Sequence, residues 1–315
     1  MVEKAGKRVA VIGAGTMGPG IAMSYARAGA SVKVYSRQQK TLDRAQAVMM
    51  SSLDLLTEKG KLSPSGKEET VSRVEFTDSL ESAAGEADLL VETVVENKDV
   101  KRDLLAKLAT ICPSRTVFAS NTSTLNIFEI SPRPLTTVIT HWFAPPHLIP
   151  LVEVVRGPET TEGVMETVVG ELRAMGKVPV VLNQFVPGFV INRLLRALGR
   201  ESFYLLDNGI VTPEALDRAV KASLAPRMMV LGIVQRYDFT GLDLSARNLA
   251  NPEFTDAPED HHPKSLFSLV EAGHLGVKTG RGFYDYGGRP LTEILRERDE
   301  KLMQVFDSTT FCLDQ

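Results

Sequence analysis

The sequence predicts an α/β protein in which a doubly wound, mostly parallel sheet is followed by a mostly α-helical C-terminal domain. Strand-like and helical segments alternate through the first half of the 315 residues. This alternation is typical of a parallel sheet with right-handed crossovers. Beyond about residue 184 the strand-like segments stop and the patterns are helical. We therefore expect two domains, 1–184 and 185–315.

The composition is that of an ordinary globular protein, with 43% hydrophobic residues, 24% charged residues and a net charge of −3. This charge does not indicate binding to nucleic acid or anionic membranes. The cysteines, Cys112 and Cys312, are too few for a disulfide framework and favour a reducing compartment. The chain enters a strand without an apolar signal segment, and no apolar run approaches the roughly 20 residues of a membrane span. We expect a cytoplasmic protein and predict no metal site.

The elements of the first domain follow in order. We expect strands over "RVAVIG", "SVKVYS", "ADLLVETV" and "TVFAS", which are short and apolar. Helices are expected over 21–27, 38–59 and 100–110. The loop between "TVITH" and "PLVEVV" is too short for a helix, so these two strands should be antiparallel. A helix over 161–174 and a strand over "KVPVVL" close the domain.

The second domain begins after Pro187 and Gly188, in "NQFVPGFV". Helices are expected over 191–208, 213–222 and 265–272. Pro213 suits the first turn of its helix, with Thr212 as the N-cap. "VKTGRGFYDYGGR" should form a glycine-rich turn around an aromatic cluster.

A glycine-rich motif, "VAVIGAGTMGPG", follows the first strand and opens the first helix. Gly13, Gly15 and Gly18 have the G-x-G-x-x-G spacing. Gly13 permits the tight turn, Gly15 lets a pyrophosphate approach the backbone, and Gly18 allows close packing of helix on strand. The helix N-terminus then faces the phosphates. We predict a Rossmann-type dinucleotide-binding domain and place Met17 in its binding loop.

The choice between NAD and NADP depends on the end of the second strand. An NAD-selective site usually carries Asp or Glu there, whereas this chain has Ser36 and Arg37. A hydroxyl and a guanidinium suit a 2′-phosphate. The cofactor is therefore NAD or NADP, with NADP favoured. The alternative is that Arg37 is a solvated loop residue.

A histidine, His141, ends the buried strand before "WFAPP". Across the proposed hairpin, Glu153 lies within an apolar strand, where a carboxylate is costly unless it is paired. With the turn centred near His147, these two residues lie opposite each other. The glutamate would fix the imidazole tautomer and raise its basicity. Such a pair suits a general base that takes a proton from an alcohol as hydride leaves for a nicotinamide.

These segments resemble the 3-hydroxyacyl-CoA dehydrogenases. The similar stretches run in order from about Arg8 to Tyr286: "VIGAGTMGPGIA", "VETVVENKDVK", "ASNTSTL", "HWFAPPHLIPLVEVV", "VPGFVINRLL" and "KTGRGFYDY". The resemblance implies an NAD(P)-dependent oxidoreductase of fatty acid metabolism that acts on a small-molecule substrate. It also implies a homodimer formed through the helical domain. Glu96 and Lys101 match the family's cofactor-contacting residues in V-E-N-x-x-V-K.

The resemblance further implies the catalytic residues. His141 matches the family's base in H-x-F-N-P, and Glu153 matches the glutamate that orients it. Ser123 matches the serine on the substrate and nicotinamide side. Asn192 matches an asparagine at the start of the helical domain. Ser123 and Asn192 would bind the reacting oxygen, and their alternative role is as helix caps.

The chain departs from the family at three places. Ala144 stands where the family has an asparagine that polarises the substrate carbonyl. Removing one such donor typically costs about 2.7–4 kcal/mol of transition-state stabilisation. Ser36 and Arg37 replace the family's aspartate after the second strand, and "VLGIVQRYDFTGLD" replaces a G-P-F stretch.

Three functions remain open. The leading one is oxidation of a 3-hydroxyacyl-type secondary alcohol to the ketone, with an acyl-CoA favoured over a free acid. Lys59 and Lys61 lie where the family's helical hairpin meets CoA, although exposed lysines are usually only solvated. The alternatives are a dehydrogenase of a free hydroxy acid or other alcohol, and a catalytically weak cofactor-binding relative. Short β-hydroxyacid dehydrogenases are disfavoured because they need a lysine where this chain has Asn192 and Arg193.

Overall fold

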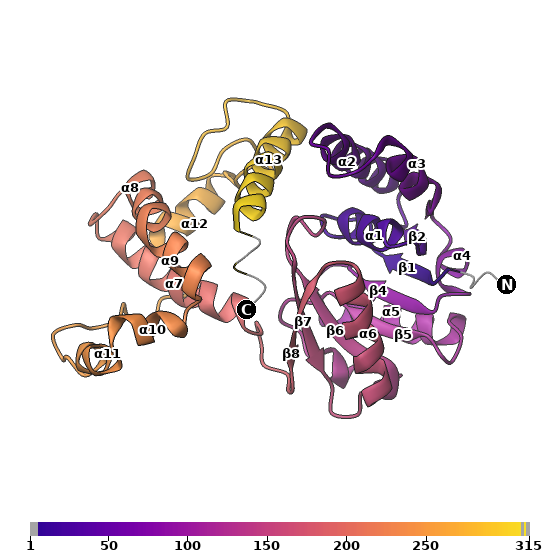
Figure 1. The fold of residues 1–315 in the computed structure, drawn as a ribbon, viewed down its shortest axis with the longest axis horizontal. Coiled ribbons are helices and arrows are strands. Elements are labelled where there is room, and N and C mark those ends of the chain that lie inside the picture. The colour runs from indigo at the N-terminus through magenta and orange to yellow at the C-terminus, as the bar shows by residue number, and fades with distance from the viewer. Residues whose placement is uncertain (1–5, 310–311, 313–315) are drawn as a thin grey trace. The chain divides into compact units, whose positions relative to one another are not determined.

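The computed structural model describes residues 6–309 and 312. The chain divides into two compact units, Met1–Arg193 and Leu194–Gln315 (Figure 1). The predicted boundary after residue 184 lies shortly beyond the last strand, which ends at Leu182. The division into compact units falls instead inside the helix that comes next, α7 (Ile191–Asp207).

Unit 1 contains one eight-stranded sheet with the order β3-β2-β1-β4-β5-β6-β7-β8. Strands β1 to β6 are parallel to one another, whereas β7 is antiparallel to β6 and parallel to β8. The strands are β1 (Arg8–Ile12), β2 (Ser31–Tyr35), β3 (Val74–Thr77), β4 (Leu89–Glu92), β5 (Val117–Ser120), β6 (Thr137–Trp142), β7 (Leu151–Arg156) and β8 (Val178–Leu182).

The helices of unit 1 are α1 (Gly18–Arg27), α2 (Gln39–Glu58), α3 (Pro64–Ser72), α4 (Leu80–Ala84), α5 (Lys98–Ile111) and α6 (Glu162–Ala174), with short 3-10 turns η1 (Ile127–Glu129) and η2 (Pro134–Thr136). The predicted α/β architecture is confirmed. Every strand and helix predicted for this half is present. The predictions omitted α3, β3 and α4, which lie together between α2 and β4.

Two apolar layers cover the sheet. Ile21 of α1 and Leu172 of α6 pack in one layer, and Leu105 of α5 packs in the other. Side chains alternate along a strand. Ile139 of β6 and Val155 of β7 belong to the layer of α5. His141 and Glu153 each lie two residues away along the same strands, so both point to that face of the sheet.

The β6–β7 hairpin has the register that the sequence predicted. The strands are antiparallel, and His141 pairs with Glu153. The prediction of the hairpin and of this pairing is confirmed. The connection from β7 through α6 to β8 then restores parallel pairing.

Unit 2 is helical. Beyond α7 it contains α8 (Pro213–Ala219), the π-helical turn η3 (Val220–Leu224), α9 (Ala225–Leu231), α10 (Gln235–Thr240), α11 (Leu242–Leu249), α12 (Lys264–Glu271) and α13 (Leu291–Thr309). The hydroxyl of Thr212 accepts a hydrogen bond from the Ala215 amide at 3.2 Å, so the predicted N-cap of α8 is confirmed. The helices α9, α10, α11 and α13 were not predicted.

Apolar side chains of unit 2 are widely exposed. No residue in α7 to α12 is fully buried within the described chain. Leu195 is 56% exposed and Phe239 is 72% exposed. This unit therefore leaves much apolar surface without cover from its own residues.

Candidate active site

The glycine-rich turn joins β1 to α1, and two of its glycines have no room for a side chain. Gly13 has φ of 122°, and a Cβ there would lie 2.7 Å from the Thr93 hydroxyl. A Cβ on Gly18 would lie 2.0 Å from the Gly13 carbonyl oxygen. These contacts explain the tight turn and the close packing that the motif predicts.

The third glycine, Gly15, faces open space. No atom lies within 4 Å of the position that its Cβ would take. Helix α1 follows, and its N-cap residue Met17 makes no side-chain capping bond. The backbone here is open to a phosphate and lies at a helix N-terminus, where anions are favoured. The residues present therefore fit a dinucleotide.

Ser36 and Arg37 follow β2 at the same edge of the sheet. The Ser36 hydroxyl is near the Gln38 amide, at 3.4 Å. Arg37 is exposed and makes no hydrogen bond or ion pair with any residue that the structure describes. Its guanidinium is thus available to a phosphate, and equally to solvent.

The buried pair of the site is His141 with Glu153. His141 is 4% exposed, Glu153 is 1% exposed, and the His141 Nδ1 lies 2.8 Å from the Glu153 Oε2. An ionised carboxylate can only accept, so the imidazole donates from Nδ1. Nε2 is then left as the basic nitrogen.

Glu153 also holds the start of α7. Its Oε1 accepts hydrogen bonds from the amides of Val190 and Ile191, both at 2.9 Å. Burial alone would raise the pKa of Glu153, but the bonds to His141 and to these two amides outweigh it and lower the pKa. The carboxylate is therefore ionised at neutral pH and fixes the tautomer of the imidazole.

Aromatic rings enclose the imidazole. The ring centroids of Phe143 and Phe189 lie 4.5 and 5.2 Å from that of His141. Phe189 is 1% exposed and has φ of 51°, a left-handed conformation that is unusual for a bulky residue. The segment before α7 is thus bent so that an aromatic ring covers the histidine.

Ser123 lies on the loop after β5, and Glu96 holds that loop. The Glu96 Oε1 accepts from the Ser123 amide at 2.9 Å, the Thr124 amide at 2.8 Å and the Thr122 hydroxyl at 2.6 Å. The Ser123 hydroxyl makes no hydrogen bond within the described residues. The cap at Leu125 is made by Thr122 instead. Ser123 is therefore free to donate to a ligand.

Lys101 is buried beneath this loop. It is 1% exposed, and its Nζ lies 2.7 Å from Oε1 and 2.9 Å from Oε2 of Glu92, which is fully buried. The Ser120 hydroxyl donates to the same carboxylate. The Lys101 ammonium lies 3.4 Å from Glu96 Oε2. This network supports the loop, and a direct contact of Lys101 or Glu96 with a cofactor stays a prediction.

Asn192 lies in the first turn of α7, one residue beyond the Ile191 amide that Glu153 binds. It therefore lies inside the helix rather than at the N-cap position. Its side chain is half-buried and has no hydrogen-bond partner among the described residues. The loop of Ser123 is tied to the strand of His141, because the Trp142 amide donates to the Asn121 side chain at 2.8 Å. The structure thus brings His141, Glu153, the Ser123 loop and the start of α7 together.

Two family sequence models match the chain. One, described as 3-hydroxyacyl-CoA dehydrogenase, NAD binding domain, matches residues 8–185, and another, described as 3-hydroxyacyl-CoA dehydrogenase, C-terminal domain, matches residues 188–286. The chain belongs to the 3-hydroxyacyl-CoA dehydrogenase family. It is an oxidoreductase with a site for a nicotinamide cofactor.

Relatives in the 3-hydroxyacyl-CoA dehydrogenase family differ in their substrates. A probable 3-hydroxybutyryl-CoA dehydrogenase from Deinococcus radiodurans is 38% identical over 88% of this chain and 99% of its own. The 5-formyl-3-hydroxy-2-methylpyridine 4-carboxylate 5-dehydrogenase from Mesorhizobium japonicum is 33% identical over 95% and 97%.

Solved structures show the same range. A structure of a 5-formyl-3-hydroxy-2-methylpyridine 4-carboxylic acid 5-dehydrogenase, an NAD⁺-dependent dismutase, matches with a TM-score of 0.84 and 33% identity over 95% of this chain and 97% of that one. The (S)-3-hydroxybutyryl-CoA dehydrogenase of Ralstonia eutropha matches with a TM-score of 0.70 and 30% identity over 89% and 99%.

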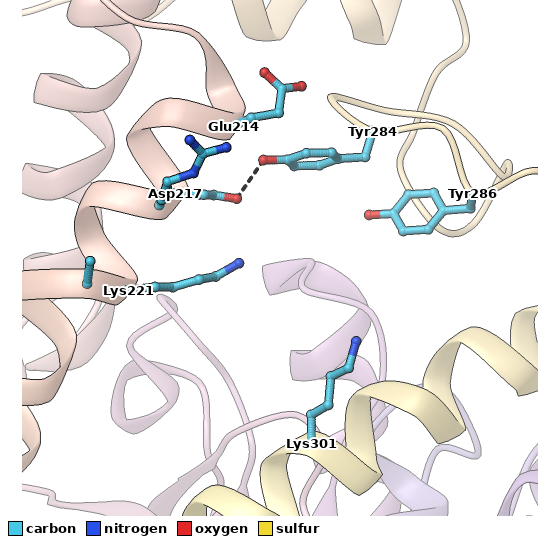
Figure 2. Close-up of a pocket in the computed structure, with 8 residues that line it drawn as sticks. Glu214, Asp217, Lys221, Tyr284, Tyr286 and Lys301 are labelled. Atoms are coloured by element: carbon cyan, nitrogen blue, oxygen red, sulfur yellow. Dashed lines mark hydrogen bonds between the residues drawn. The ribbon is translucent and has the colours of Figure 1, made fainter.

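A pocket of about 820 Å³ lies wholly in unit 2. Figure 2 shows Lys221 of η3 and Lys301 of α13 extending toward the space beside Tyr284 and Tyr286. The Tyr284 hydroxyl donates to Asp217 at 2.7 Å, which anchors the predicted glycine-rich turn on α8. None of the residues that line this pocket belongs to the His141 site.

Sequence reasoning missed several residues that support the site. Glu92 ends the buried strand "LLVE", and the argument that marked Glu153, a carboxylate in an apolar strand, would have marked it too. Asn121 lies in the quoted "ASNTSTL", but its bond to Trp142 depends on the fold. Lys177, which donates to two carbonyls of the loop before β7, had no distinguishing signal in the sequence. No described helix is both long and apolar enough to cross a membrane.

Proposed function

We propose that this protein oxidises a 3-hydroxyacyl-type secondary alcohol to the ketone, with His141 as the general base and Glu153 as the residue that orients it. The observation that carries the proposal is the buried pair at 2.8 Å between His141 Nδ1 and Glu153 Oε2. A buried carboxylate that accepts from Nδ1–H fixes the tautomer of the neutral imidazole in which Nε2 can take a proton.

The residues act on the substrate oxygen. The hydroxyl proton passes to His141 Nε2. A nicotinamide, when bound, would accept the hydride that the carbinol carbon loses. The C–O single bond becomes the ketone, and the imidazolium that forms is stabilised by Glu153. Ser123 and Asn192, whose polar side chains have no partner among the described residues, would donate to the same oxygen as charge develops.

An acyl-CoA is the first substrate class to test. The relative from Deinococcus radiodurans is named as a probable 3-hydroxybutyryl-CoA dehydrogenase and aligns with nearly the whole chain. We place the protein in fatty acid metabolism on this basis. The cofactor is NAD or NADP, and the free Arg37 guanidinium favours NADP.

A second candidate is a dehydrogenase of a free hydroxy acid or a ring-borne alcohol. Ala144 favours it, because this exposed residue offers no donor to a thioester carbonyl. The solved structure of a pyridine carboxylic acid dehydrogenase favours it as well, since its match to this chain has a TM-score of 0.84.

Nicotinamide absorbance during acetoacetyl-CoA reduction tests the proposal, with NADH and NADPH in parallel. Turnover that is lost in His141→Asn and Glu153→Gln, with cofactor binding retained, would support it. Normal turnover in both variants would show that the reaction occurs elsewhere. If the wild-type protein binds the cofactor but does not reduce acetoacetyl-CoA, the second candidate is favoured. That candidate is tested with small hydroxy acids and pyridine alcohols.

We further infer a cytoplasmic homodimer. The two cysteines, Cys112 and Cys312, are both free, as expected in a reducing compartment. Exposed apolar side chains of unit 2 suit an interface between copies. We assign residues 1–184 to cofactor binding and 185–315 to substrate binding and dimerisation.

A further inference from the structure

Lys177 lies between α6 and β8, and its ammonium is buried. The residue is 9% exposed. Its Nζ donates to the Pro146 carbonyl at 2.6 Å and to the Ile149 carbonyl at 2.9 Å. None of the carboxylates that the structure describes forms an ion pair with it. A buried cation without a carboxylate is costly, so a role in packing alone does not explain a lysine here.

Both carbonyls belong to one loop, residues 143–150, which joins the strand of His141 to the strand of Glu153. The loop begins at Phe143, whose ring contacts the His141 imidazole. Its middle lies against the first turns of α1, where a Cβ on Gly20 would come within 2.9 Å of the Pro146 ring. The loop therefore contacts both the histidine and the helix whose N-terminus is proposed to bind the cofactor phosphates.

The groups around the Lys177 ammonium, apart from the two carbonyls, are an aromatic ring and another cation. The Nζ lies 5.3 Å from the Trp142 ring centroid. Burial and the nearby Arg27 lower the pKa of Lys177 to about 8. The strongest favourable contacts that remain are the two carbonyls, and charge-assisted bonds of this kind are short and strong.

We propose that Lys177 is a positioning residue that holds the 143–150 loop through two of its carbonyls and so aligns the substrate between His141 and the nicotinamide. The proposal rests on the proposed function. A neutral side chain of similar length would leave both carbonyls without a donor, and the loop would become mobile. Misplacement of about 1 Å is enough to lower a rate about 10²-fold.

Lys177→Met tests this, with Lys107→Met as the matched control because Lys107 makes only an exposed ion pair with Glu81. Hydrogen exchange is followed at Leu148 and Ile149, whose amides both donate to the Pro145 carbonyl at 3.0 Å. We expect exchange there to become about tenfold faster in Lys177→Met and unchanged in Lys107→Met. In parallel, kcat should fall about 10²-fold with little change in cofactor affinity. Lys177→Arg, which keeps the charged donors, should retain more turnover.

The outcomes separate the possibilities. Unchanged hydrogen exchange in Lys177→Met would show that Lys177 does not hold the 143–150 loop. Faster exchange with unchanged kcat would show that holding the loop does not position the substrate. If Lys177→Met does not fold, Lys177→Arg and Lys177→Gln are compared instead, and equal exchange and kcat in the two would overturn the need for an ammonium. If the wild-type protein turns over no substrate, the proposed function is wrong. The hydrogen-exchange data would still decide whether Lys177 holds the loop.

Discussion

At position 153, one carboxylate oxygen faces an imidazole and the other faces the first turn of a helix. The Glu153 carboxylate therefore accepts hydrogen bonds from two sides, from His141 Nδ1–H and from the amides of Val190 and Ile191. A neutral isostere keeps the shape but cannot serve both partners equally well. The consequences of a substitution here should be larger in turnover than in fold.

Glu153→Gln should lower kcat by about 10³–10⁴-fold. The amide nitrogen facing Nδ1 makes that atom an acceptor and moves the proton to Nε2, so His141 has the wrong tautomer for a base, as in serine proteases whose triad carboxylate becomes an amide. Steady-state kinetics measure the loss, and the cofactor dissociation constant serves as the control. Turnover within about tenfold of wild type would contradict the assigned role.

Arg37→Ala addresses the cofactor. If the guanidinium binds a 2′-phosphate, the variant should bind NADPH about 10–100-fold more weakly and NADH nearly as before, because a bond to a charged group contributes about 1.5–3 kcal/mol. Fluorescence titration with both cofactors measures this. Equal weakening of the two would mean that Arg37 is a solvated loop residue.

Lys177 makes stability depend on pH in an unusual direction. Its pKa is lowered to about 8 in the folded chain, below the ordinary value of 10.5. Below about pH 8 both states are protonated, and the cost of the buried charge is fully present. As the pH rises from 8 towards 10.5, the folded state loses its proton first, so the free energy of unfolding should rise, by at most about 3 kcal/mol. Urea unfolding of wild type and Lys177→Met across this range isolates the effect, and a constant difference between them would contradict it.

Among the elements, the turn between β1 and α1 offers a matched pair of substitutions. Gly15→Ala enters open space, so the fold should persist while cofactor affinity falls at least about tenfold. Gly18→Ala places a Cβ 2.0 Å from the Gly13 carbonyl oxygen and should destabilise the protein by about 1–3 kcal/mol. Urea unfolding and cofactor titration distinguish the two. Equal losses of stability in Gly15→Ala and Gly18→Ala would mean that Gly15 is packed as closely as Gly18.

The elements that could be predicted were those with a strong local pattern. The strands of the parallel sheet are apolar runs between amphipathic helices, and the hairpin followed from a connection too short for a helix. The α3–β3–α4 segment has short, partly polar elements, and β3 contains no fully buried residue. Helices α9 to α11 have only six to eight residues each, which is shorter than the roughly 11–18 residues over which a helical period is recognised.

For the whole molecule, the exposed apolar surface of unit 2 predicts association. Leu195 and Leu198 are 56% and 45% exposed and lie on one face of α7. Light scattering should give a mass of about twice the 34.4 kDa of one chain. The double variant Leu195→Asp with Leu198→Asp should be monomeric, whereas Leu135→Asp, at a residue of unit 1 that is also 56% exposed, should not change the mass. A wild-type mass of one chain at high concentration would exclude the dimer.

The candidate site was only partly accessible to sequence reasoning. His141 and Glu153 could be paired because strand alternation and one loop length set their register. The partners of Lys101, Glu96 and Lys177 could not, since each depends on which loop carbonyls and carboxylates the fold brings near a buried side chain. Such contacts join segments far apart in the chain and leave no periodic signal.

The antiparallel pairing of β6 with β7 also restricts how this protein can diverge. Side chains alternate between faces, so deleting or inserting one residue within either strand would turn His141 or Glu153 away from its partner. The 143–150 connection is held as well, through the carbonyls of Pro146 and Ile149 that bind Lys177. Descendants of this chain can therefore exchange residues in the hairpin while its length stays constant. Insertions that create new substrate preferences have to enter elsewhere in the chain.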